Sequence, residues 1–420
     1  MRLWFVLATK SAWSRRGPLA LVVCAIAVAI FLVLAVAQLR QDARTSFSNA
    51  VSGVDLIVGA RGSPTELMLY SIFNLGKPVR NLSFDQLDEI TKLDSVSWAV
   101  PLQLGDSYRG FPVVGTTPLF FSKVGGKIGL EFSQGQAFSH IFDAVLGADI
   151  AKRLGHTVGD AIALTHGRGD GLAQDHADRP FRVTGVLKKT GTPTDNAVLI
   201  SLAGFEAIHI GWEFGSKPRQ TETLSLDRID PMRLQPSQVT AVLVGLQSRT
   251  QVFSARRSIE GLDGGKLMAI LPGVTLDELW QIMRTLENTL RFTAWLVVIT
   301  ALFGITSTLL ISISTRRREL AIFRALGAQP IQLSLLVVIE SVVMCTIGLL
   351  LGWVLLQITV LGVGDWIRSQ FGVFMTPRLP DAEGWWAIGS MLGLSTLAGL
   401  IPAWRAFRYS VHDGLHPPIV

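Results

Sequence analysis

The stretch that decides the fold is FTAWLVVITALFGITSTLLISIST, residues 292–315, which contains no charged side chain. A bilayer core requires about 20 apolar residues as helix, because its lipid offers no water to the backbone groups. Three more segments meet this requirement, at residues 18–39, 331–364 and 384–404, and the only charge in them is Glu340. The sequence therefore predicts an α-helical membrane protein with four transmembrane helices.

Composition and charge agree with this class. The 420 residues are 49% hydrophobic and only 17% charged, and their net charge is +6. The excess of positive charge lies in the short flanks of the spans, which argues for membrane topology rather than for nucleic acid. The positive-inside rule then places both termini in the cytoplasm and residues 40–291 on the outer side. The flanking residues are Arg2, Lys10, Arg15 and Arg16 before the first span, Arg316, Arg317, Arg318 and Arg324 between the second and third, and Arg405 and Arg408 after the fourth.

The first span also resembles a secretory signal peptide, because Arg15 and Arg16 precede it and small residues end it. Its apolar run is too long for a signal peptide, so we expect an uncleaved anchor. Both cysteines, Cys24 and Cys345, fall inside apolar spans, and the large outer region can therefore hold no disulfide.

The outer region alternates strand-like and helix-like patterns, which predicts an α+β domain. Ser83 and Gln86 form a capping box, and residues 144–154 are expected to be a helix that ends at Gly155. A turn at residues 191–193 suggests a hairpin between its neighbouring strands. Strands are expected at residues 96–104, 160–165, 181–187 and 197–200.

A helical stalk is predicted at both ends of this region. Thr275 and Glu278 form a second capping box, and five apolar residues then recur at alternating spacings of three and four, as in a coiled-coil seam. The seam residues are Leu276, Leu279, Met283, Leu286 and Leu290, and a matching stripe after the first span is Leu39, Ala43, Phe47 and Val51. Two amphipathic helices packed on the base of the domain are the alternative.

The sequence offers little catalytic chemistry. Each Gly-Lys pair is followed by Pro, Ile or Leu, so there is no phosphate-binding loop, and we expect a non-enzymatic chain without a cofactor of its own. His166 and His176 lie in an Asp-containing loop and are weak metal candidates, although a solvated loop is the better interpretation. Glu340, inside the third span, should face a bundle interior, a partner or the inner interface, and a structural role is favoured over a proton or substrate relay.

The stretch TRRRELAIFRALGAQP at residues 315–330, followed by a helix with Glu340, Gly348 and Gly352, resembles the MacB/FtsX-type ABC permeases. Residues 145–162 and 399–416 and the basic N-terminus agree with this resemblance. It implies three parts: the N-terminus with the first helix (1–39), a MacB-like periplasmic core domain with stalk helices (40–291), and an FtsX-like domain (292–420) that contains a cytoplasmic coupling helix (316–328).

The resemblance further implies a subunit of the bacterial inner membrane that works by mechanotransmission, as a homodimer or with a second permease. ATP and Mg²⁺ would bind to a separate ABC ATPase, which would dock on Arg316, Arg317, Arg318, Glu319, Phe323, Arg324 and Leu326. Besides membrane lipids, a periplasmic adaptor, a lipoprotein or a cell-wall hydrolase are possible partners. The function implied is export or lipoprotein extraction, and the alternative is a signalling scaffold that transports nothing. The substrate stays open.

Overall fold

The computed structural model describes residues 16–76, 78, 80–125, 129–166, 179–210, 234–371 and 373–408. The chain divides into two compact units. The helical unit contains Met1–Asp42, Met283–Trp366 and Met375–Val420, and the α/β unit contains Ala43–Ile282 and Ile367–Phe374.

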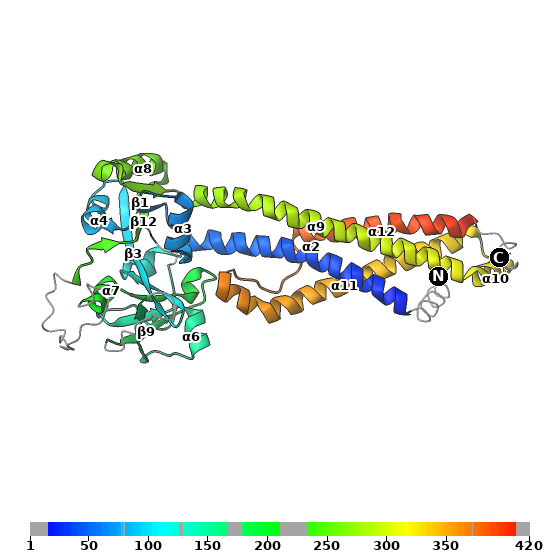
Figure 1. Cartoon of the computed structure of the whole chain (residues 1–420), viewed down its shortest axis with the longest axis horizontal. Helices are drawn as coiled ribbons and strands as arrows, with labels where there is room; N and C mark the ends of the chain where they lie inside the picture. Colours follow the sequence, from blue (N-terminus) through cyan, green and yellow to red (C-terminus); the bar gives the residue numbers. More distant parts are fainter. Residues whose placement is uncertain are drawn as a thin grey trace. The chain divides into compact units, whose positions relative to one another are not determined.

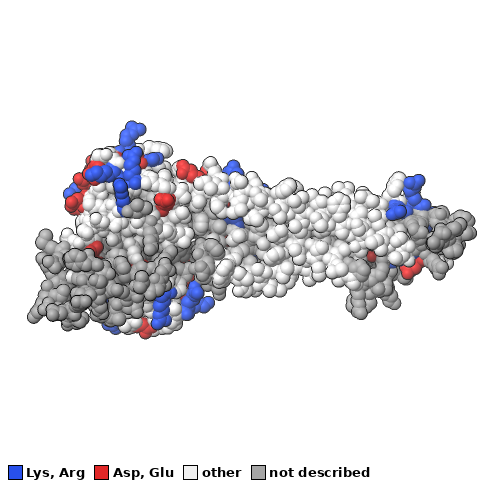
Figure 2. Space-filling view, viewed as in Figure 1, with Lys and Arg blue, Asp and Glu red and all other residues white. Residues whose placement is uncertain are grey.

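Among the described residues, four helices are long and apolar enough to cross a membrane, which agrees with the predicted number of spans. The longest has 44 residues and measures about 66 Å, roughly twice a bilayer's hydrocarbon core. Figure 2 shows the surface along the middle of these helices as almost free of charged side chains. The four are α2 (Arg16–Ala50), α9 (Pro272–Thr315), α11 (Pro330–Phe371) and α12 (Ala382–Arg408), and the short α10 (Arg317–Ala325) lies between α9 and α11 (Figure 1).

Small residues let α11 approach its neighbours closely. A Cβ added to Gly352 would lie 2.1 Å from a methyl of Ile30 on α2, so only glycine fits this contact. On the side toward α12, the Ser341 hydroxyl donates to the Ser395 carbonyl at 3.0 Å. Close approach and hydrogen bonds between helices replace the hydrophobic effect as the source of packing energy inside a bilayer.

The α/β unit is built on one mixed sheet with the strand order β13-β1-β12-β3-β4-β10-β6-β9-β5, to which β7 and β8 add short edges. β2 and β11 form a separate pair. The strands are β1 (Leu56–Ala60), β2 (Leu82–Ser83), β3 (Val96–Tyr108), β4 (Phe111–Thr116), β5 (Phe132–Gly135), β6 (Asp143–Leu146), β7 (Ala161–Ile162), β8 (Thr165–His166), β9 (Phe181–Leu187), β10 (Val198–Ser201), β11 (Gln238–Val239), β12 (Ala241–Leu246) and β13 (Leu267–Ile270).

The long strand β3 joins two halves of this sheet. Its first part pairs with β12 from Val96 to Leu102, and its second part pairs with β4 from Gln103 to Tyr108, with a register shift after Leu104. Helices cover both halves. They are α3 (Pro64–Phe73), α4 (Phe84–Thr91), α5 (Leu119–Lys123), α6 (Ala148–Leu154), α7 (Leu202–His209) and α8 (Val252–Gly261).

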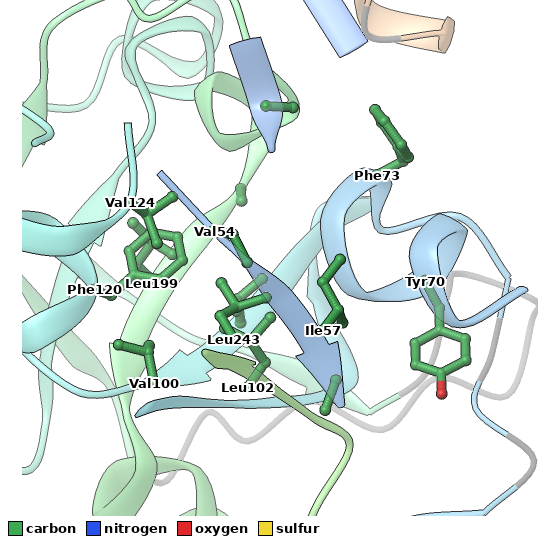
Figure 3. Close-up of a cluster of buried hydrophobic side chains, with 14 of the residues drawn as sticks. Val54, Ile57, Tyr70, Phe73, Val100, Leu102, Phe120, Val124, Leu199 and Leu243 are labelled. Carbon is green, nitrogen blue, oxygen red and sulfur yellow. The ribbon is translucent and has the colours of Figure 1, made fainter. Parts of the chain in front are cut away.

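Alternation along the strands builds separate cores on the two faces of the first half. Ile57 of β1 packs with Phe73 of α3 and Leu102 of β3, and this is the cluster drawn in Figure 3. Its neighbours Leu56 and Val58 point the other way and pack in the core beneath α4 and α8.

Three local predictions for this unit need correction. Residues 144–146 are not helical: they form β6, which pairs with β10 and β9, and the helix begins only after Gly147. The predicted hairpin at residues 191–193 is absent, because β6 lies between β9 and β10 in the sheet. α9 begins at Pro272, so Thr275 lies inside the helix, where its N–H donates to the Leu271 carbonyl, and it is not an N-cap. The capping box at Ser83 is confirmed.

Candidate functional site

Helix α10 follows directly on the end of α9. Arg316 forms the junction: its N–H donates to the Ser312 carbonyl at 3.1 Å, and its carbonyl accepts from the Leu320 N–H at 3.0 Å. Gly327, at φ +95°, ends this segment in the left-handed conformation that glycine tolerates. Pro330 then begins α11, a position where its missing N–H costs nothing. α10 is therefore a distinct element between two long helices.

The apolar side chains of α10 divide between two faces. Leu320 is buried, and Phe323 packs half-buried against the core of the helical unit. Ile322 and Leu326 are 54% and 80% exposed. Since these two are four residues apart, they lie on one side of the helix. The exposed apolar face of α10 is therefore formed by Ile322 and Leu326.

The predicted coupling residues differ in how far their side chains are exposed. The Glu319 side chain is exposed, Arg324 is half-buried, and the side chain of Arg316 is only 11% exposed and lies 3.6 Å from Glu340 on α11. The side chains of Arg317 and Arg318 lie outside the described residues. Ile322 is missing from the predicted set because the predicted stripe, Leu320, Phe323 and Leu326, follows a spacing of three residues. The spacing of four between Ile322 and Leu326 is the sequence signal for the exposed face of α10.

The predicted seam residues also have two environments. Leu276 is buried, and Leu279 packs against the main core of the α/β unit. Further along α9, within the helical unit, Met283, Leu286 and Leu290 are 38%, 53% and 43% exposed. The first turns of the seam therefore pack on the domain, while the later turns present apolar side chains at the surface of this single chain.

Two cavities lie one after the other along α2 and α9 within the helical unit. The first is an open hollow of about 670 Å³, lined by Leu21 to Val28 of α2 and Val297 to Gly304 of α9. A second cavity of about 340 Å³ is lined by Val33 to Arg40 of α2, by Glu287 to Trp295 of α9 and by α12. Its centre is about 12 residues further along α2, or roughly 18 Å. We call the two cavities together the α2–α9 groove.

Charged groups stand at one end of this groove. Glu383 of α12 forms ion pairs with Arg40 of α2 and, at 2.9 Å, with Arg291 of α9. These three residues, the Arg–Glu–Arg cluster, line the second cavity together with Trp295 and Trp386. An apolar hollow followed along the same helices by a cavity with charged and aromatic lining has the polarity of an amphiphile: the first can hold hydrocarbon and the second a polar headgroup.

The titratable groups of the α/β unit near the end of β3 bond to one another. The Tyr108 hydroxyl lies 2.9 Å from Nε2 of His156, whose Nδ1 lies 3.3 Å from Asp160. A hydrogen bond from the Thr157 N–H lowers the pKa of Asp160. Burial alone would lower the pKa of His209, but the adjacent Asp106 carboxylate outweighs it and raises that pKa above its usual 6.5. These contacts link β3 to neighbouring elements.

The predicted metal candidates cannot be placed. His176 and the side chain of His166 lie outside the described residues. Within the part of the chain that is described, no three His, Cys, Asp or Glu side chains gather as a metal site would require.

Two family models match successive parts of the chain. The MacB-like periplasmic core domain matches residues 19–262, more than half of the chain, and the FtsX-like permease C-terminal model matches residues 291–411. The chain belongs to the MacB/FtsX-type ABC permease family. This MacB/FtsX-type permease is therefore a multi-pass membrane protein.

Two curated relatives of the permease come from Haemophilus influenzae. It is 27% identical over 284 residues to the lipoprotein-releasing system transmembrane protein LolE, a match that covers 63% of this chain and 62% of the relative. It is 24% identical over 275 residues to LolC of the same system, covering 64% and 62%. The permease thus matches less than two thirds of the length of each relative.

Two solved structures are similar to part of the chain. The periplasmic region of MacB from Actinobacillus actinomycetemcomitans is 12% identical, with a TM-score of 0.35, over 58% of this chain and 98% of that one. The extracellular domain of the ABC-type transporter YknZ from Gram-positive bacteria is 13% identical, with a TM-score of 0.30, over 52% and 98%.

Proposed function

We propose that this permease is the membrane subunit of an ATP-driven machine that extracts an amphiphile of the lipoprotein class from the outer leaflet of the inner membrane. The observation that carries the proposal is the α2–α9 groove, whose first cavity is apolar and whose second cavity contains the Arg–Glu–Arg cluster. The names of the two curated relatives, which belong to a lipoprotein-releasing system, support the same class of cargo.

The groove suits a lipidated ligand for two physical reasons. Transfer of acyl chains from the bilayer into water costs free energy, so a site that receives them must be apolar, as the surfaces of α2 and α9 are here. A lipid headgroup or a peptide N-terminus carries charge, and Arg40, Arg291 and Glu383 offer partners of both signs. The exposed Trp386 indole, beside this cluster, is suited to an interface of water and hydrocarbon.

The energy would come from a separate ABC ATPase that binds ATP and Mg²⁺ and docks on α10. Ile322 and Leu326 supply the exposed apolar contact for this docking, with Glu319 and Arg324 beside them. In this arrangement both termini are cytoplasmic and the MacB-like domain is periplasmic. A second permease chain would cover Met283, Leu286 and Leu290, whose exposure suits a stalk shared between two subunits.

The test is binding of a fluorescent diacylated lipopeptide to the permease in lipid nanodiscs. Val36 lines the second cavity of the groove. Val36→Trp places an indole in this space, and we expect the affinity for the lipopeptide to fall at least about tenfold. Leu39→Trp is the matched control: Leu39 stands on the same helix, is exposed and does not line the groove, so its variant should bind like the unmodified chain.

Equal affinity of the Val36→Trp and Leu39→Trp variants, with both chains inserted normally, would remove the groove as the cargo site. Undetectable lipopeptide binding by the unmodified permease, together with ATP-dependent activation of a periplasmic hydrolase, would instead favour the signalling scaffold.

A further inference from the structure

A buried ion pair connects the start of α10 to the first quarter of α11. The Glu340 side chain on α11 is 9% exposed and the Arg316 side chain is 11% exposed, with Nη1 and Oε2 3.6 Å apart. Glu340 stands ten residues into α11, or about 15 Å along its axis. The arginine at the α9–α10 junction thus reaches back along α11 rather than into solvent.

Arg316 belongs to both helices that it joins. Through its backbone it extends the hydrogen bonding of α9 and receives the first bond of α10. Buried Leu320 and Ala321 hold α10 beside this junction. The position of the guanidinium is therefore tied to the position of α10, and a movement of α10 that separated the pair would lose the attraction between two poorly solvated charges, at high cost.

A second carboxylate offers an internal comparison. Glu319 lies 3.7 Å from Nε of Arg316, but its side chain is 60% exposed. Exposed pairs of this kind contribute little, because water and salt compete for both charges. Of these two carboxylates, only Glu340 is desolvated enough to hold Arg316 in place.

We propose that the buried Arg316–Glu340 pair is a latch that fixes the α9–α10 junction to α11, so that a push on α10 moves α11 with it. Glu340 is then a positioning residue for energy coupling. The role in coupling rests on the function proposed above, whereas the latch itself can be measured in the permease alone.

The first arm measures the α10–α11 distance in the full chain in nanodiscs, without an ATPase. Spin labels are attached at Ala325→Cys on α10 and Leu350→Cys on α11, both exposed positions, after Cys24→Ser and Cys345→Ala. Pulsed electron paramagnetic resonance then gives the distance distribution. We expect one narrow distribution in the latched chain, and a distribution about twice as wide after Glu340→Gln, because the neutral amide no longer fixes the charged partner.

Three further variants make this arm decisive. Glu319→Gln should leave the distribution narrow. Arg316→Gln combined with Glu340→Gln removes both charges of the pair together, so it should insert even if the single variant does not, and it should show the wide distribution. The exchanged pair, Arg316→Glu with Glu340→Arg, should restore a narrow one. A narrow distribution in the double Gln variant, or a wide one after Glu319→Gln, overturns the latch.

The second arm measures coupling in the complex with the ATPase, as the amount of fluorescent lipopeptide released from vesicles per ATP hydrolysed. In Glu340→Gln, or in the double Gln variant, this ratio should fall at least about fivefold with the ATPase still co-purifying, and the exchanged pair should recover it. An unchanged ratio in a chain whose distance distribution has widened contradicts a role in coupling. If the unmodified complex releases no lipopeptide, the proposed function fails, while the first arm still decides the latch.

Discussion

The exposed face of α10 leads to a quantitative prediction about ATPase docking. Moving a leucine side chain from water into an interface contributes roughly 1.5 to 3 kcal/mol. Leu326 is 80% exposed, so most of this contribution is still available for docking. We expect Leu326→Ala to lose about 1 to 2 kcal/mol of binding free energy, which weakens the affinity for the ATPase roughly 5- to 30-fold. The assay is a titration of the ATPase against nanodisc-embedded permease by biolayer interferometry.

Two comparisons separate docking from folding. Leu320 is 5% exposed, so Leu320→Ala should lower the free energy of unfolding of the permease itself by about 2 to 5 kcal/mol. Leu361 on α11 is 70% exposed but distant in sequence from α10, and Leu361→Ala should leave the ATPase affinity unchanged. The reasoning is refuted if Leu326→Ala binds the ATPase as tightly as the unmodified chain while its insertion and stability are normal.

Three other predictions test separate parts of the account. Gly352→Val should lower the melting temperature of the permease, because its Cβ would collide with Ile30, a cost of about 1 to 3 kcal/mol, whereas Gly362→Val, in open space, should cost far less. Because the pKa of His209 is raised, the folded α/β unit binds the proton of this side chain more tightly than the unfolded chain does. The free energy of unfolding should therefore decline as the pH rises above about 6.5. Scanning calorimetry of His209→Gln should show a weaker decline with pH than the unmodified chain. Leu286→Asp should reduce cross-linking between paired permease chains while leaving membrane insertion intact, and undiminished cross-linking would exclude this face.

The membrane helices could be predicted from the sequence because the pattern that indicates them lies within each segment. Each span is a long apolar run, and a bilayer admits no other backbone structure for it. The capping box at Ser83 and the strand at residues 181–187 were also predicted correctly, since both depend on neighbouring residues. Residues 144–146 were not, because the helical pattern after Gly147 was extended backward over a strand that only its sheet partners define.

The candidate site was less predictable because its contacts join distant segments. The residues near Glu340 in the sequence do not indicate that Arg316 is its partner. The cost of a buried charge did predict that Glu340 faces a partner or an interface. The Arg–Glu–Arg cluster likewise unites α2, α9 and α12. On α10, periodicity identified an apolar stripe, but which of two stripes faces the core depends on how the helix packs.

The central claim, that the α2–α9 groove receives a lipidated cargo, is tested most directly by site-specific photo-cross-linking. A benzophenone amino acid is placed at Val36 or Val297, which line the groove, or at Leu361, which is exposed on α11 and does not line it. After illumination with a diacylated lipopeptide in nanodiscs, the account predicts strong adducts at both groove positions and only background at Leu361. Equal labelling at all three positions, or labelling at Leu361 alone, would contradict it.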